Sequence, residues 1–143
     1  MVSAIPTDER CVPHDHPACN LRALHEAFAV DANIVGNPLT REDGDVDASL
    51  PQARALLAVN PQPFDAVLLG MGADGHFASL FPGAANLAEG LATESGIDAL
   101  ATLPDPLPPE APFARISLTL PRLLHAKQIH LVVTGADKRA VLR

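Results

Sequence analysis

The chain has 143 residues, of which 48% are hydrophobic and 3% aromatic, and its formal net charge is −7. This length and composition suit one domain with an aliphatic core and argue against wholesale disorder. An acidic chain without a run of Lys or Arg lacks the basic surface that nucleic-acid binding needs. No apolar run approaches the ~20 residues that span a bilayer, and the N-terminus resembles no secretory leader. Because Cys11 and Cys19 are the only cysteines, we expect no disulfide framework and a cytoplasmic protein.

The first half of the chain predicts two helices joined by a loop, after a short apolar stretch at the N-terminus. Apolar residues recur at helical spacing from Asn20 to Val30, which predicts the first helix. Residues 31–48 are rich in Asn, Asp, Gly and Pro, which predicts a loop. The second helix is predicted from Leu50 to Val59, with Ser49 as its N-cap and Pro51 in its first turn.

The second half alternates between strands and helices. The predicted elements are, in order, a buried strand at 66–69, the first turns of a helix at 77–81, a strand at 116–120, a short helix at 121–126, a buried strand at 129–133 and a helix from Ala136. Residues 82–112 predict no element, and the prolines from Pro104 to Pro112 make a stiff connector. This alternation predicts an α/β fold, which we expect to be one Rossmann-like three-layer domain over residues 1–143 with a mainly parallel sheet.

A glycine-rich loop follows the predicted strand at 66–69. Its sequence is Gly70-Met71-Gly72-Ala73-Asp74-Gly75-His76. Ligands of open α/β sheets bind beyond the carboxyl ends of the strands, and glycines let a ligand approach backbone amides closely. Histidine is the usual proton acceptor near neutral pH, and a neighbouring carboxylate such as Asp74 orients it. Asp8-Glu9-Arg10 and the segment from Gly135 to Lys138 also follow apolar stretches, so we expect the three loops to converge on one site.

These motifs resemble those of a known family. The run from Phe64 to His76, followed by Ala78-Ser79-Leu80-Phe81-Pro82-Gly83, closely resembles the signature of 6-phosphogluconolactonases. The resemblance extends, in the family's order, to Asp8-Glu9-Arg10 with Val12-Pro13, to Asn20, to Arg115 through Pro121, and to Val133-Thr134-Gly135 with Lys138. It implies hydrolysis of 6-phosphoglucono-1,5-lactone, a small sugar phosphate, to 6-phosphogluconate in the oxidative pentose phosphate pathway. It implies no cofactor or metal, because an ester carbonyl is already electrophilic.

The resemblance also implies roles for individual residues. The expected catalytic residues are His76, Asp8, Arg10 and Asp74, and the expected substrate- or phosphate-binding residues are Gly72, Gly75, Arg115 and Lys138. His76 is expected to take a proton from the attacking water. Arg10 or the amides of the glycine loop would donate to the tetrahedral oxyanion, while Asp8 would orient a substrate hydroxyl or His76.

The family's proteins are longer than this chain. They carry an upstream βα segment with a Gly/Ser-rich loop that helps to bind the phosphate, and further helix beyond the position of Arg143. We therefore expect the domain to be incomplete at its N-terminal side, with exposed strand edges. We also expect the 143 residues alone to be weakly active or inactive and poorly stable as a monomer. The oligomeric state stays open.

Three alternatives remain. Aminosugar-phosphate isomerases/deaminases share the fold but place a glutamate five residues beyond the histidine, where this chain has Phe81. A non-catalytic sugar-phosphate-binding protein, or a remnant, would be consistent with the departures from the family pattern at Cys11, Cys19 and Phe77. A dinucleotide-binding domain is the third, generic option; Gly70, Gly72 and Gly75 have the spacing Gly-x-Gly-x-x-Gly, but a glycine-rich turn alone is weak evidence for it.

Overall fold

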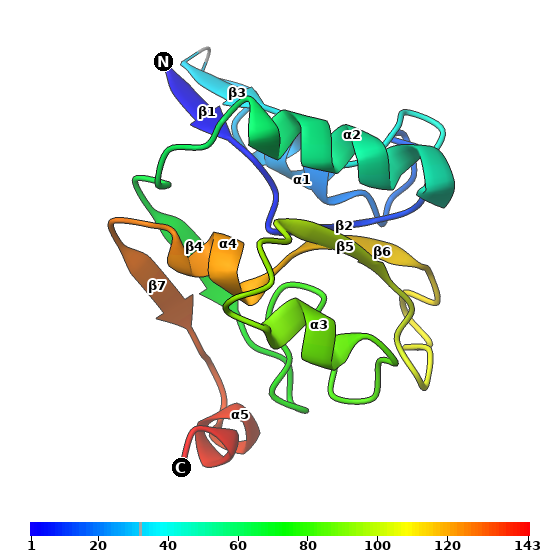
Figure 1. The fold of residues 1–143 in the computed structure, drawn as a ribbon, viewed down its shortest axis with the longest axis vertical. Coiled ribbons are helices and arrows are strands. Elements are labelled where there is room, and N and C mark those ends of the chain that lie inside the picture. Colours follow the sequence, from blue (N-terminus) through cyan, green and yellow to red (C-terminus); the bar gives the residue numbers. More distant parts are fainter. Residues whose placement is uncertain (32) are drawn as a thin grey trace.

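The computed structural model describes residues 1–31 and 33–143, so residue 32 of the predicted loop at 31–48 lies outside the described residues. Strands alternate with helices along much of the chain (Figure 1). The elements are β1 (Val2–Ala4), β2 (Asp8–Arg10), α1 (Asn20–Ala27), β3 (Ile34–Gly36), α2 (Val46–Ala58), β4 (Val67–Gly70), α3 (Leu87–Leu91), β5 (Ala99–Thr102), β6 (Arg115–Leu118), α4 (Leu120–Leu124), β7 (Ile129–Val132) and α5 (Ala136–Val141). The α/β class predicted from the sequence is confirmed.

Within the described residues, the strands form three sheets, two with parallel pairing and one with antiparallel pairing. β1 pairs with β3 in parallel, and β4 pairs with β7 in parallel, as the continuous apolar runs of β4 and β7 suggest. β2, β6 and β5 form a three-stranded antiparallel sheet with β6 in the centre. β5 and β6 are antiparallel because the connector between them contains no helix that would carry the chain back to the other end of the sheet.

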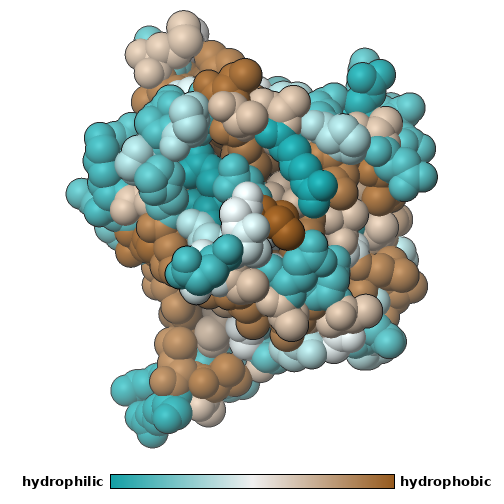
Figure 2. Space-filling view, viewed as in Figure 1, coloured by the Kyte–Doolittle hydropathy of each residue, from teal (hydrophilic) through white to brown (hydrophobic). Residues whose placement is uncertain are grey.

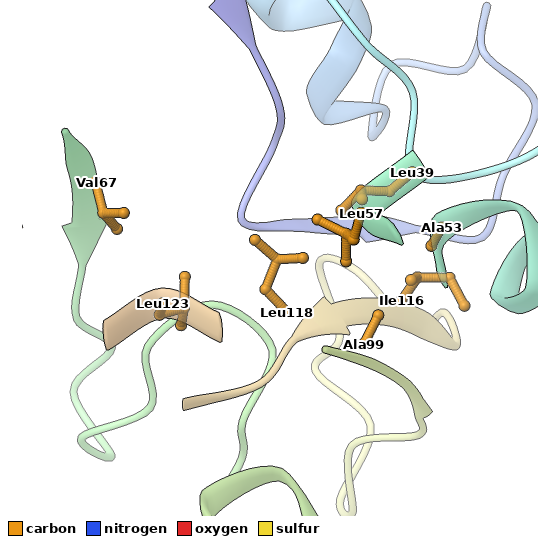
Figure 3. Close-up of a cluster of buried hydrophobic side chains, with 8 residues drawn as sticks. All are labelled: Leu39, Ala53, Leu57, Val67, Ala99, Ile116, Leu118 and Leu123. Atoms are coloured by element: carbon orange, nitrogen blue, oxygen red, sulfur yellow. The ribbon is translucent and has the colours of Figure 1, made fainter. Parts of the chain in front are cut away.

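The main hydrophobic core lies between α2 and the antiparallel sheet. Its buried members are Leu39, Ala53, Leu57, Val67, Ala99, Ile116, Leu118 and Leu123 (Figure 3). Leu57 and Ala53 come from α2, and they lie close to Ile116 of β6. Aliphatic side chains thus fill the core without any aromatic residue among its fully buried members, as the composition predicts.

The predicted loop at 31–48 contains two elements that the sequence did not indicate, β3 and the first turn of α2. The helix begins at Val46 rather than at Leu50, because Asp45 is the N-cap and its carboxylate accepts from the Ala48 amide at 2.7 Å. The predicted N-cap, Ser49, lies inside the helix, where its hydroxyl accepts from the Arg41 amide at 2.8 Å. The predicted cap was therefore wrong by one turn.

The predicted helix at 77–81 is also absent. Ala78 has a φ of 48°, which a helix cannot contain. The Ser79 amide donates to the Ser117 hydroxyl at 3.1 Å, a partner in β6 rather than in a preceding turn. The loop that carries His76 therefore leads into a segment held by the antiparallel sheet, and no helix N-terminus faces a ligand there. Between this segment and β6, the region 82–112 contains α3 and β5, which the sequence left unassigned.

The β4–β7 pair exposes apolar side chains. The prediction of two buried strands was therefore wrong, since β7 is exposed throughout and only Val67 of β4 is buried. Ile129, Leu131 and Val132 of β7 are 43%, 46% and 59% exposed, and Leu68 of β4 is 68% exposed. Figure 2 shows hydrophobic surface on the side of the molecule where Figure 1 places β7. Among the described residues, no helix combines the length and the apolar character that a membrane span requires.

In β2, the side chain of Glu9 points toward α1 and those of Asp8 and Arg10 point to the other face, since alternate residues of a strand point to opposite faces. Glu9 is 1% exposed, and its carboxylate accepts from the amides of Asn20 at 2.7 Å and Leu21 at 2.8 Å. It also accepts from the Arg10 amide at 2.9 Å. A buried carboxylate thus satisfies the N-terminal amides of α1 and fixes that helix to β2.

The replacement Glu9→Ala is expected to lower the free energy of unfolding by about 2–4 kcal/mol, because buried amides at the start of α1 lose a charged acceptor. Urea denaturation followed by circular dichroism measures this change. Glu26→Ala is the matched control, since Glu26 lies on the exposed side of the same helix in an ion pair with Arg22. Equal stability of the two variants would contradict the assigned role of Glu9.

Candidate functional site

Two cationic side chains lie directly opposite each other on the antiparallel sheet. Arg10 of β2 is in register with Arg115 of β6, and Arg115 is in register with Thr102 of β5. Asp8 of β2 is opposite Ser117, two residues along β6. Residues in register share a face of the sheet, so Asp8, Arg10 and Arg115 are presented together, on the face opposite Glu9.

The guanidinium of Arg10 is fixed by the start of α1. Its Nη1 donates to Asn20 Oδ1 at 2.5 Å and to the Ala18 carbonyl at 3.1 Å. The side-chain Nδ2 of Asn20 donates in turn to the backbone carbonyl of Asp8 at 2.8 Å. Asn20 therefore connects the backbone of Asp8 with the side chain of Arg10, and the bonds of Glu9 to the Asn20 and Leu21 amides hold Asn20 in place.

The two arginines create a local positive charge that the fold itself does not neutralise fully. Burial, and next the charge of Arg10, lower the pKa of Arg115. Within the described part of the chain, Nε of Arg10, Nε of Arg115 and the Thr102 hydroxyl are buried without a hydrogen-bond partner. Like charges placed opposite each other destabilise a sheet, and buried donors without acceptors add to that cost. An anion bound here would relieve both.

The loop after β4 orients the imidazole of His76. Nδ1 of the ring lies 2.5 Å from Asp74 Oδ1, and the same oxygen accepts from the His76 amide at 3.0 Å. Partial burial acts to raise the pKa of Asp74, but the hydrogen bonds from His76 outweigh it, so that pKa lies below its ordinary value. Because an ionised carboxylate only accepts hydrogen bonds, neutral His76 carries its proton on Nδ1 and leaves Nε2 as the acceptor. The side chain of His76 is 27% exposed, so solvent reaches it.

Gly72 makes room for this imidazole. A Cβ at Gly72 would lie 2.2 Å from both Cε1 and Nδ1 of the His76 ring, too close for any side chain. The Gly72 amide donates to the His76 carbonyl at 2.8 Å, and the Gly75 amide donates to the Gly72 carbonyl at 3.0 Å. Both amides are thus engaged inside the turn, and Gly75 has a φ of 88°, which favours glycine.

Ser79 ties the loop of His76 to the sheet of the arginines. This residue is fully buried, and its hydroxyl donates to Asp8 Oδ2 at 2.6 Å. Its amide donates to the Ser117 hydroxyl at 3.1 Å, so it contacts both β2 and β6. Two residues later, the ring of Phe81 stacks on the His76 imidazole and also contacts the Arg115 guanidinium.

Lys138 lies on α5, next to the same loop. The Val141 side chain would be 3.3 Å from a Cβ at Gly75, so α5 contacts the tip of the loop. Residues three apart on a helix share a face, which places Lys138 on the side of α5 that carries Val141. Lys138 is partly buried there.

The two thiols have no features of a nucleophile. Burial, with smaller contributions from Glu9 and Asp45, raises the pKa of Cys11 to about 11. Burial also raises the pKa of Cys19, whose Sγ lies 3.5 Å from Glu9 Oε2. Both cysteines are therefore protonated at neutral pH and serve as packing residues.

The structure brings the predicted residues together in three groups. Asp8, Arg10 and Arg115 share the sheet face; Gly72, Asp74, Gly75 and His76 form the loop; Lys138 lies on the adjoining helix. The sequence reasoning missed the roles of Ser79 and Phe81. Both lie in the run Ala78 to Gly83 that resembles the family signature, so that run was the available signal.

The comparisons with known proteins agree with one another. The family model described as glucosamine-6-phosphate isomerases/6-phosphogluconolactonase matches residues 1–143. A 6-phosphogluconolactonase of Caulobacter vibrioides is 41% identical over 144 residues, covering 99% of this chain and 60% of its own length. One from Pseudomonas putida is 40% identical over 143 residues, covering 95% of this chain and 55% of its own length.

Solved structures give the same result. A 6-phosphogluconolactonase from Shewanella baltica superposes with a TM-score of 0.85 at 35% identity, covering 99% of this chain and 59% of that one. A monomeric glucosamine-6-phosphate deaminase shares the fold, with a TM-score of 0.74 at 18% identity. The chain thus spans 55–60% of the length of the two curated relatives compared above. It belongs to the glucosamine-6-phosphate isomerase/6-phosphogluconolactonase family.

Proposed function

We propose that this chain carries the hydrolytic site of a 6-phosphogluconolactonase and acts on 6-phosphoglucono-1,5-lactone. The observation that carries the proposal is the His76 imidazole, oriented by Asp74 at 2.5 Å and tied through Phe81 and Ser79 to the sheet face with Arg10 and Arg115. The names of the relatives support the same substrate. We also propose a cytoplasmic location, which the two free thiols support.

In this proposal His76 Nε2 takes a proton from a water molecule as the water oxygen attacks C1 of the lactone. The Asp74 carboxylate stabilises the imidazolium that forms, since its own pKa is lowered and it stays ionised. The tetrahedral intermediate then collapses, the bond from C1 to the ring oxygen breaks, and the imidazolium returns the proton to that oxygen. The products are a carboxylic acid, which releases its proton to solvent and becomes a carboxylate, and a free hydroxyl; His76 is neutral again.

The cationic residues would bind the negative charges of substrate and intermediate. Arg10 is our proposed donor to the oxyanion, because the amides of Gly72 and Gly75 are engaged inside the loop. Lys138 and Arg115 are the proposed phosphate ligands; Lys138 lies on α5 beside the loop tip, and Arg115 lies opposite Arg10. Asp8, held by Ser79, would keep the loop in register with the sheet.

The contact of Phe81 disfavours the aminosugar-phosphate deaminase alternative. The Phe81 ring stacks on His76 at a centroid distance of 4.2 Å, and a phenyl ring cannot relay a proton. Release of ammonia from glucosamine 6-phosphate, measured with the purified chain, would reverse this ranking.

The first test is hydrolysis of the lactone by the chain, for which we expect a low rate, and by His76→Ala. We expect the variant to lose about 10²–10⁴-fold in kcat, the usual contribution of a general base. The rate is measured as acid release above spontaneous hydrolysis. His130→Ala is the control, because His130 is exposed on β7, where its ring Nε2 lies 3.2 Å from Gln128 Oε1.

Undiminished turnover by His76→Ala would show that His76 is not the general base. If neither protein hydrolyses the lactone, calorimetric titration with 6-phosphogluconate decides between the remaining alternatives. Binding of 6-phosphogluconate without turnover of the lactone would indicate a sugar-phosphate sensor rather than an enzyme. The absence of binding would indicate a remnant.

A second test alters the space beside the imidazole. Gly72→Ala places a methyl group 2.2 Å from the His76 ring, so the ring must move, and we expect kcat to fall by about 10–10²-fold. Gly70→Ala is the matched control at the end of β4, directly before the loop, since a Cβ there meets nothing within 4 Å. Equal activity of the two alanine variants would show that the position of the imidazole does not limit the reaction.

A further inference from the structure

Phe81 contacts both the proposed base and a cation of the proposed anion site. Its ring centroid lies 4.2 Å from that of the His76 imidazole, with an angle of 27° between the planes. The Arg115 guanidinium carbon lies 4.9 Å from the same centroid. Phe81 is 6% exposed, so its ring is a buried element of the site. No other aromatic contact within the described residues joins His76 to a cation.

The ring is held in place by the sheet rather than by the loop alone. Ser79 is bonded to Asp8 on β2 and to Ser117 on β6, and Phe81 follows two residues later. The Phe81 carbonyl accepts from the Ala84 amide at 3.1 Å, which fixes the backbone on the other side. The buried residues from Ser79 to Phe81 therefore connect β6 to the His76 imidazole.

The chemistry of a phenyl ring suits this place. Its faces carry partial negative charge and attract cations, and a ring pair at this distance packs favourably. The contact with His76 strengthens when the imidazole becomes positive, which happens as the proton leaves the water. Interactions that strengthen along the reaction raise its rate, whereas equal binding of the ground state does not.

We infer that Phe81 is a positioning residue that aligns the His76 imidazole and the Arg115 guanidinium, an inference that rests on the proposed role of His76 as the base. Phe81 donates and accepts no proton. It sets where the base and the cation stand relative to each other.

The test compares the wild-type chain with Phe81→Leu, Phe81→Tyr and the control Phe64→Leu. Phe64 is a partly buried core residue whose ring contacts the Arg122 guanidinium at 3.9 Å, so its loss removes the same kind of contact elsewhere. The first measurement is NMR of the histidine ring protons. We expect upfield ring-current shifts of the His76 protons in the wild type, their loss in Phe81→Leu, and their retention in Phe81→Tyr and Phe64→Leu.

The second measurement is lactone hydrolysis. Phe81→Leu is expected to lower kcat by about 10–10²-fold through misplacement of the base, and to raise KM through Arg115. In both Phe81→Tyr and Phe64→Leu, kcat and KM are expected to stay near the wild-type values.

Ordinary shifts of the His76 protons in the wild type would overturn the inference, as would unchanged kcat and KM in Phe81→Leu. Should Phe81→Leu fail to fold, the wild-type shifts and Phe81→Tyr still decide. The two claims fail separately. Undiminished turnover in His76→Ala refutes the base, while the ring-current shifts test the contact of Phe81 without any activity.

Discussion

The hydrogen bond from the Ser79 hydroxyl to Asp8 Oδ2, at 2.6 Å, joins the two parts of the candidate site. His76 belongs to a loop after the parallel strand β4, whereas Arg10 and Arg115 belong to the antiparallel sheet. Because Ser79 is fully buried and also bonds Ser117, this connection has two points of attachment. Together with the Phe81 ring, it fixes the position of the imidazole relative to the arginines.

The strand β2 has a structural role on one face and carries residues of the candidate site on the other. Glu9 points back to the start of α1 and satisfies the amides of Asn20 and Leu21. Asp8 and Arg10 point to the opposite face, where Arg10 is in register with Arg115. Two like charges in register carry a cost in stability, and functional sites commonly retain such a cost.

Much of the site was predictable because it is encoded in continuous local sequence. The apolar runs of β4 and β7 and the glycines around His76 need no tertiary information, and the motifs from Asp8 to Lys138 appear in the family's order. The segment at 77–81 was not predictable by periodicity. Its Ser79 bonds Ser117 and Asp8, which are 38 and 71 positions away, and such long-range partners override a local helical pattern.

The remaining differences have similar causes. Asp43 and Asp45 precede α2 and Asp47 lies in its first turn, and only the folded backbone selects Asp45 as the cap. β5 was missed because its four residues carry no alternation and lie among glycines and prolines. The contact of Phe81 with His76 was not predictable from the sequence, because stacking depends on how the single segment that carries both residues turns back in space.

A crystal structure of the chain with 6-phosphogluconate tests most directly whether base and cations serve one substrate. We expect the C1 carboxylate of the product within hydrogen-bond distance of His76 Nε2 and Arg10, with its phosphate at Lys138 or Arg115. A ligand bound elsewhere, or His76 Nε2 directed away from it, would contradict the central claim that Ser79 and Asp8 unite one hydrolytic site.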